Sequence, residues 1–201
     1  MSRALTEVRQ NFPGLEIRLA AISNEDGAEQ VRRGALDMVI LSRFGAARPR
    51  TQLGLREWTL GSDALRLCVP GGHPLAKADE VAMAQLQHEP WIVSPSSTIG
   101  QLIATLCLTA GFEPQIAASV NDLATAVGLV AVGWGITIAP ELTPGNSDRP
   151  VAHVRLADVS TLRHSVLIVR EGEHLFPRIA TAIAAVREVS ARSWTTPPLE
   201  I

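Results

Sequence analysis

The sequence predicts an α/β protein with two Rossmann-like lobes, each a mainly parallel sheet flanked by helices. Short β-branched runs alternate with longer segments of helical periodicity, a pattern typical of βα units. The order strand, helix, strand occurs twice. One stretch rich in proline and glycine lies between the two occurrences, and another follows the second. With 201 residues, 46% of them hydrophobic, the chain fits one large domain or two small lobes, and the repeated order favours two lobes.

The first strand–helix–strand order lies near the N-terminus. After a helix at 5–12, its expected elements are a strand at 16–22, a helix capped by Asn24 or Asp26 that runs to 33, and a strand at 38–41. Pro13 and Gly14 end the opening helix, and Gly34 can take the left-handed conformation that often follows a helix. One complete unit is therefore expected before residue 45.

A second copy of this order begins at residue 115. Its expected elements are a strand at 115–120, a helix capped by Asn121 or Asp122 that runs to 132, and a strand at 136–139 that Pro140 ends. The two copies share little sequence but keep the same order of elements. Two similar lobes are the economical explanation.

Two loops are expected to carry the chain between the lobes. Further strands are expected at 53–60, 64–69, 91–93, 151–156 and 165–169, and a final amphipathic helix at 177–189. The loop at 70–74 holds two prolines and two glycines, and the stretch 142–150 is rich in Pro, Gly, Asn and Ser. We therefore expect lobe I to comprise residues 1–68 and 145–201, and lobe II residues 69–144.

Charge and hydrophobic patterning argue against several kinds of partner. The 20 acidic and 18 basic residues nearly cancel, so the chain lacks the positive surface that direct DNA contact requires. No stretch approaches the roughly 20 apolar residues that span a bilayer, and the N-terminus lacks the apolar core of an export signal. We therefore expect a cytoplasmic protein without membrane contact. Cys68 and Cys107 lie in apolar runs and are expected to be reduced core residues.

Five phrases occur in a specific order: FPGLEIRL, RRGALDMVIL, GGHPLAKADEVAMAQLQHEPWIV, TAGFEP and VAVGWGITIAPELT. Within residues 5–169 they resemble the effector-binding domain of LysR-type transcriptional regulators. The resemblance implies a fold like the type II periplasmic binding proteins, with two lobes joined by two crossover segments and a small-molecule effector between them. It also implies a homodimer or homotetramer. DNA would be bound only through an N-terminal helix-turn-helix domain, and we expect this chain to lack that domain and the first strand of lobe I.

Polar residues that follow the expected strands are the candidate effector contacts. Ligands of open α/β sheets bind at the carboxyl ends of the strands, where the N–H groups of helix N-termini favour an anion. The candidates are Ser23, Asn24, Ser42, Arg43, Ser94, Ser96, Ser97, Thr98 and Asn121. The resemblance implies an effector at these same positions. The four hydroxyls between residues 94 and 98 are the strongest candidates, since together they can hold a carboxylate.

Each candidate also has a structural explanation. Serine, threonine and asparagine are ordinary helix caps, so capping alone can account for any single one of them. Arg43 can neutralise an anionic effector through a forked contact, or it can be a solvated loop arginine beside Arg48 and Arg50. Asp37 resembles a catalytic carboxylate, but the sequence places no partner acid or base near it. We therefore expect Asp37 to cap a turn.

The chain contains no recognisable motif for catalysis or for cofactor or metal binding. The five histidines lack metal-ligand spacing, and Gly133-Trp134-Gly135 precedes a strand, whereas a dinucleotide fingerprint follows one. We expect a binding protein, not an enzyme, with neither cofactor nor metal. Two alternatives stay open. One is a small-molecule enzyme on the same scaffold, for which only Asp37, Arg43 and Cys68 are available. The other is a transporter-type solute-binding protein, against which the missing export signal argues.

Overall fold

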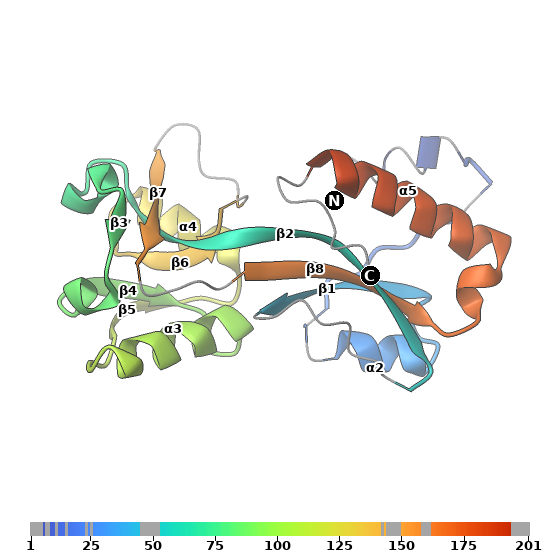
Figure 1. The fold of residues 1–201 in the computed structure, drawn as a ribbon, viewed down its shortest axis with the longest axis horizontal. Helices are drawn as coiled ribbons and strands as arrows, with labels where there is room; N and C mark the ends of the chain where they lie inside the picture. Colours follow the sequence, from blue (N-terminus) through green and yellow to red (C-terminus); the bar gives the residue numbers. More distant parts are fainter. Residues whose placement is uncertain are drawn as a thin grey trace. The chain divides into compact units, whose positions relative to one another are not determined.

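Two units make up the fold, and the chain passes twice between them (Figure 1). Unit 1 consists of Met1–Asp63 and Leu162–Ile201, and unit 2 of Ala64–Thr161. The computed structural model describes residues 6, 9–10, 12–14, 16–22, 24, 26–44, 53–141, 143, 150–157 and 162–193.

The passages between the units differ from those that the sequence indicates. The chain leaves unit 1 after Asp63 and returns after Thr161, rather than at the loops 70–74 and 142–150. The Gly71 N–H donates to the carbonyl of Pro150 over 2.8 Å, which joins one end of each loop. Both ends therefore belong to unit 2.

Unit 1 is a layer of strands with a helix on each face. Its strands are β1 (Met38–Phe44), β8 (Leu162–Arg170) and the first part of β2 (Leu55–Pro70), in the order β1-β8-β2. Its helices are α2 (Gly27–Arg32), the 3-10 turn η3 (Glu173–Leu175) and α5 (Pro177–Ser193). Alternate residues of β8 point to opposite faces, so Ile168 packs with Val31 of α2 while Leu167 packs with Ile183 of α5. Figure 1 shows α2 and α5 on the two sides of these strands.

Unit 2 packs two helices against a short parallel pair and the second part of β2. Its strands are β3 (Glu80–Val81), β4 (Pro90–Val93), β5 (Gln115–Ser119), β6 (Thr137–Pro140) and β7 (Val151–Leu156). Its helices are η1 (Pro74–Lys77), η2 (Met83–Leu86), α3 (Thr98–Thr109) and α4 (Leu123–Ala131). Cys68, Ile92, Val127 and Ala139 form the centre of its core. A single bridge between Trp91 and Ile136 joins β4 to the start of β6.

Strand pairing is mixed, where the sequence predicts a mainly parallel sheet. The pairs β3–β7 and β4–β5 are parallel, whereas β1–β8, β2–β6 and β2–β7 are antiparallel. In unit 2 the antiparallel pairs arise because β6 and β7 both run back along the single long strand β2. The βα units of the sequence pattern therefore explain the parallel pairing of β4 with β5, but not the antiparallel pairing of the strands beside β2.

Strand β2 is continuous where the sequence indicates two strands. Gly61, Ser62 and Asp63 are typical turn residues, but the side chains of Ser62 and Asp63 bond across to β8. The Ser62 hydroxyl lies 2.6 Å from His164 Nδ1, and Arg163 donates to both Asp63 carboxylate oxygens over 2.8 and 2.9 Å. These cross-strand bonds hold the segment extended.

The expected strand at 16–22 is not formed, and that prediction is wrong. None of the described strands pairs with this segment, and the Leu19 side chain is 71% exposed. Alternating apolar residues stabilise a strand only when a neighbouring edge accepts its hydrogen bonds and covers one face. Of the expected helix at 5–12, residues 6, 9 and 10 are helical and Phe12 is not, while residues 5, 7, 8 and 11 lie outside the described residues.

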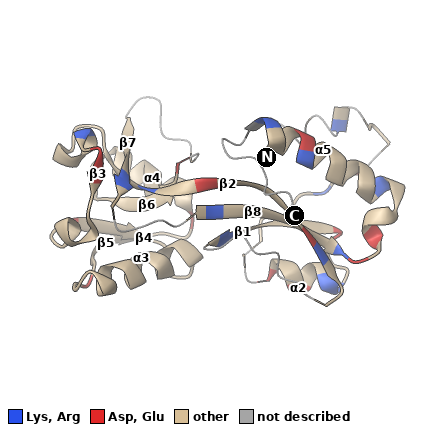
Figure 2. Cartoon of the chain, in the orientation of Figure 1, with Lys and Arg blue, Asp and Glu red and all other residues tan. Residues whose placement is uncertain are grey.

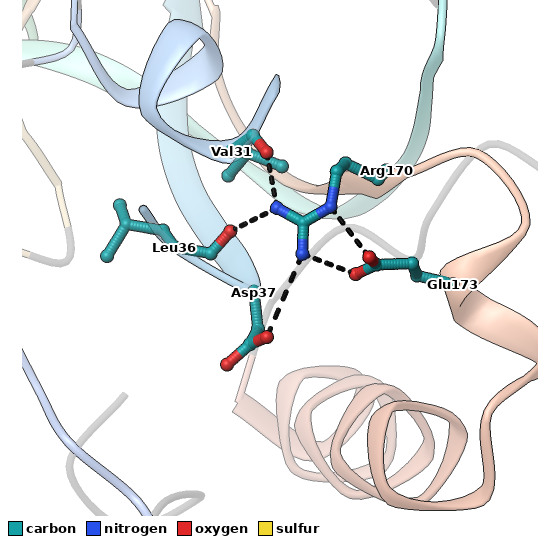
Figure 3. Close-up of polar contacts among 5 residues, drawn as sticks. All are labelled: Val31, Leu36, Asp37, Arg170 and Glu173. Atoms are coloured by element: carbon teal, nitrogen blue, oxygen red, sulfur yellow. Dashed lines mark hydrogen bonds and ion pairs between the residues drawn. The ribbon is translucent and has the colours of Figure 1, made fainter. Parts of the chain in front are cut away.

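Arg170 joins four parts of unit 1 (Figure 3). Its Nη1 donates to the carbonyl oxygens of Val31 and Leu36 over 2.5 and 2.8 Å, which fixes the end of α2 and the turn into β1. Its Nε and Nη2 donate to the two carboxylate oxygens of Glu173, and Nη2 lies 3.8 Å from Asp37 Oδ1. These anionic partners raise the pKa of the Arg170 guanidinium, so the group stays charged.

Charged residues are absent from α3 and α4, which are drawn without blue or red in Figure 2. Both helices pack largely apolar residues into unit 2, including Ile103 and Val130. They are only 12 and 9 residues long. Among the described segments, none forms a helix with both the length and the apolar character needed to cross a lipid bilayer.

Candidate functional site

A hollow of about 90 Å³ opens in unit 2 where β4 and β5 end and where α3 and α4 begin. It has a polar side and an apolar side. The lining residues are Ser94, Ser97, Ile99, Ile103, Asn121, Asp122, Leu123, Ala126 and Thr137. The Val120 N–H donates to the Val93 carbonyl over 2.9 Å, so the two strand ends are held side by side. The hollow thus occupies the position in an open α/β sheet where ligands commonly bind.

A tight turn at residues 94–97 builds one wall of the hollow. Both the N–H and the hydroxyl of Ser97 donate to the Ser94 carbonyl, over 2.9 and 2.8 Å. The Ser97 hydroxyl also accepts the Gly100 N–H over 3.0 Å and so caps α3. A Cβ atom on Gly100 would lie 2.0 Å from the Ser94 carbonyl oxygen, so only glycine permits this close approach. The turn therefore depends on the residue pair Ser97 and Gly100.

Asp122, an exposed residue, also lines the hollow and caps α4. Its carboxylate accepts the Thr125 N–H over 2.8 Å and the Thr125 hydroxyl over 2.7 Å. These hydrogen bonds hold the pKa of the Asp122 carboxyl below its usual value. The group is therefore ionised at neutral pH, at the rim of the hollow.

The Ser94 hydroxyl oxygen is buried and has no hydrogen-bond partner among the described residues. Buried hydroxyls are normally bonded, so such an atom on a cavity wall points to a partner that is supplied from outside the chain. Thr137 contributes a second hydroxyl to the wall, which is already bonded because it donates to the Ile92 carbonyl over 2.8 Å. Ser94 is thus the wall hydroxyl that is left for a ligand.

The structure brings together part of the predicted set. Ser94, Ser97 and Asn121 line the hollow, but Ser97 serves chiefly as the cap of α3. Ser96 is exposed at the turn, and neither Ser96 nor Thr98 lines the hollow. Sequence reasoning missed Thr137, because a threonine inside a buried strand has the same pattern as a β-former chosen for packing.

The predicted contacts in unit 1 have local partners. Asn24 uses both ends of its amide on the backbone of Ser42, accepting its N–H over 2.9 Å and donating to its carbonyl over 2.5 Å. Ser23 lies outside the described residues. Arg43 belongs to β1, and its Nη2 pairs with the Glu57 carboxylate, whose side chain is 5% exposed. The expectation of a solvated loop arginine is therefore wrong. Nη2 of Arg43 is engaged by Glu57, whereas its buried Nη1 has no hydrogen-bond partner among the described residues.

The two thiols are buried, whereas Asp37 lies at the surface. Cys68 and Cys107 are free and buried, as expected, and burial raises their thiol pKa values to about 12 and about 11. Asp37 pairs with Arg170 on the surface of unit 1, where its side chain is 66% exposed. Among the residues that the structure describes, no three His, Cys, Asp or Glu side chains gather as metal ligands do.

His153 on β7 lies against the core of unit 2, and this position changes the pKa of its ring. Its Nδ1 lies 3.5 Å from Cys68 Sγ. Burial lowers the pKa of His153, Arg66 adds to this effect, and Glu141 opposes it. The folded chain therefore resists protonation of this ring more than the unfolded chain does.

Acidification is expected to destabilise the wild type more than a His153→Gln variant. As the pH falls through about 6.5, the unfolded chain takes up the proton first, so stability is lost below that pH and the loss ends once the folded form is protonated too. Urea unfolding at pH 7.5 and 5.5 measures the two losses. His88→Gln, which removes an exposed histidine of the same unit, is the control and should behave as the wild type does. Equal losses in the wild type and His153→Gln would contradict the prediction.

Comparisons with known proteins agree on one family. The family model described as the LysR substrate binding domain matches residues 1–191. The chain is 28% identical to the HTH-type transcriptional regulator CatR of Pseudomonas putida over 92% of its own length and 63% of that protein. It is 26% identical to the HTH-type transcriptional regulator AlsR of Bacillus subtilis over 84% of its length and 55% of that protein. The chain thus spans less than two thirds of these relatives.

Solved structures show the same fold. The regulatory domain of CcmR from Synechocystis PCC6803, in complex with 2-PG, matches 96% of this chain and 92% of its own with a TM-score of 0.78 at 16% identity. The effector binding domain of BenM with its effector benzoate matches 96% of this chain and 86% of its own, with a TM-score of 0.72 at 22% identity. The predicted fold class, a two-lobed α/β domain of the type II periplasmic binding protein kind, is therefore confirmed.

Proposed function

Because this chain belongs to the family of LysR substrate binding domains, we propose that its hollow in unit 2 holds part of a small polar or anionic effector. The observation that carries this proposal is the buried Ser94 hydroxyl without a partner on the wall of the hollow. Benzoate and 2-PG accompany related domains of the same fold. A small organic acid is accordingly the first class of ligand to test.

The start of α3 offers the donors that an anionic end of the effector needs. The first N–H groups of a helix, here those of Thr98 and Ile99, have no acceptor within the helix. Together with the helix dipole they favour a carboxylate or phosphate group. The Ser94 hydroxyl would bond the part of the effector that enters the hollow. Asn24, Ser42 and Arg43 of unit 1 stay predicted contacts.

The chemistry proposed for the site is binding without turnover. An effector that binds one conformation more tightly than another shifts their populations by that difference in affinity. In an intact regulator, a helix-turn-helix part outside this chain would pass the shift to DNA, in a homodimer or homotetramer working in the cytoplasm. Its relatives CatR and AlsR are transcriptional regulators by name.

A thermal-shift screen of benzoate, shikimate, short-chain carboxylates, amino acids and sugar phosphates tests the proposal. We expect at least one compound to raise the melting temperature and to be recovered unchanged. Ser94→Ala should weaken that compound's binding about five- to tenfold, which is the effect of one lost hydrogen bond of about 1 kcal/mol. Thr105→Ala is the control, because Thr105 is exposed further along α3 and bonds only its own helix.

Two outcomes would overturn the proposal. If Ser94→Ala binds the compound as tightly as Thr105→Ala does, the effector does not use the hollow. If the compound is converted to a product during the incubation, the domain is an enzyme rather than a sensor.

A further inference from the structure

We propose that Asp122 makes the hollow in unit 2 selective for charge, so that it accepts an uncharged end of the effector and excludes a second carboxylate or phosphate. This inference rests on the proposed function and narrows the class of effector. It predicts a molecule with one anionic group and a small neutral end, and it identifies Asp122 as a specificity-determining residue.

The charges around the hollow favour this selectivity. Of the nine residues that line it, Asp122 is the one with an ionisable side chain. Neither α3 nor α4 carries a lysine or arginine, as Figure 2 shows. A group entering the hollow therefore meets a carboxylate and no side-chain cation among its walls.

The carboxylate of Asp122 keeps its charge because it caps α4. Its bonds to the N–H and hydroxyl of Thr125 stabilise the ionised form. Through these bonds the Asp122 carboxylate already occupies the positive end of the α4 dipole. The start of α4 is therefore less available to a ligand anion. The start of α3 has an uncharged cap, Ser97, and keeps its attraction for an anion. The start of α3 therefore attracts a ligand anion, whereas the start of α4 does not.

The remaining walls suit a compact end with both hydroxyl and hydrocarbon character. Ser94 and Thr137 supply hydroxyl oxygens, and Ile99, Ile103 and Leu123 supply apolar surface. The volume of about 90 Å³ is several times the space that one water needs in a cavity. An end of a few non-hydrogen atoms can fill it, and a hydroxyl on that end can pair with the buried Ser94 oxygen.

Succinate and 4-hydroxybutyrate form a matched pair of probes, since both are four-carbon chains with a carboxylate at one end. At the other end succinate has a second carboxylate, and 4-hydroxybutyrate has a hydroxyl. Dissociation constants for both would be measured by NMR titration up to 50 mM, following the amides of residues 94, 96–100 and 121–125. The proteins compared are the wild type and Asp122→Asn. Asparagine caps a helix as well as aspartate does, so this variant removes the charge and keeps the fold.

We expect the wild type to prefer 4-hydroxybutyrate, and Asp122→Asn to improve succinate binding about three- to tenfold while leaving 4-hydroxybutyrate nearly unchanged. That range is what two like charges a few ångströms apart produce in a partly solvated site, and 0.5 M NaCl should reduce it. Glu113→Gln, which removes a negative charge from the exposed turn before β5, should change neither constant. Asp122→Ser provides a second uncharged cap if Asp122→Asn does not fold.

The inference is overturned if the ratio of the two constants is the same in the wild type and in the uncharged variants. It is also overturned if neither probe shifts the amides of the hollow in any of these proteins. A screen that finds an effector whose binding depends on Ser94, combined with an unchanged ratio here, would reject the charge selectivity and leave the proposed function standing.

Discussion

Replacing Gly100 with alanine is expected to destabilise unit 2 by about 2–3 kcal/mol and to abolish ligand binding in the hollow. The new Cβ would lie 2.0 Å from the Ser94 carbonyl oxygen and 2.7 Å from its carbonyl carbon. Both are backbone atoms, so no side chain can rotate away and the start of α3 must shift. Overpacking of this kind typically costs 1–3 kcal/mol. The shift would also disturb the bonds between Ser97 and Ser94 that form the wall of the hollow.

Gly128→Ala is the matched control for this prediction. Gly128 lies inside α4, and an added Cβ there meets no atom within 4 Å. Alanine should therefore stabilise the helix by up to about 1 kcal/mol. Urea unfolding of the two variants measures the contrast, and the ligand titrations described above follow the hollow. If Gly100→Ala were as stable as the wild type, the close packing of α3 on Ser94 would be wrong.

Replacing Arg170 with methionine is expected to destabilise unit 1 by about 3 kcal/mol. The variant would leave the Leu36 carbonyl without its donor and Glu173 without its forked partner (Figure 3). It would also remove one of the two donors to the Val31 carbonyl, which keeps the Gly34 N–H. A buried polar group that loses its partner costs about 1–3 kcal/mol, and here more than one loses it at the same time. The end of α2 and the turn before β1 should loosen together.

Two further variants separate the geometry of Arg170 from its charge. Arg170→Lys should recover less than half of the loss, because one ammonium group cannot reach both edges that the planar guanidinium serves. Arg18→Met removes an arginine that is 87% exposed and pairs with exposed Glu16, so it should change stability by less than about 0.5 kcal/mol. Urea unfolding gives all three values. Similar losses for Arg170→Met and Arg18→Met would show that the Arg170 contacts contribute nothing.

Local patterns in the sequence were sufficient to predict most helices and strands. The strand at 151–156 has the expected bounds, and the caps Ser97 and Asp122 stand where their residue types favour helix starts. Tertiary bonds account for the misses. Ser62 and Asp63 look like turn residues until β8 supplies partners for them, and the alternating residues 16–22 look like a strand although no described strand pairs with them.

The candidate site was predictable in position but not in detail. The rule that ligands bind at the carboxyl ends of strands places Ser94 and Asn121 at the hollow. The same rule cannot reveal that Arg43 is already paired with Glu57, because that contact joins residues on two different strands. Nor can it find Thr137, which reaches the hollow from inside a buried strand.

The continuity of β2 limits how this domain can be dissected or recombined. Its 16 residues extend from unit 1 through the division at Asp63 into unit 2. A gene fragment cut at that division would sever one strand and strip hydrogen-bonding neighbours from the sheets on both sides of the cut. The halves are therefore poor candidates for separate expression, and a chimera between relatives is better joined outside residues 55–70.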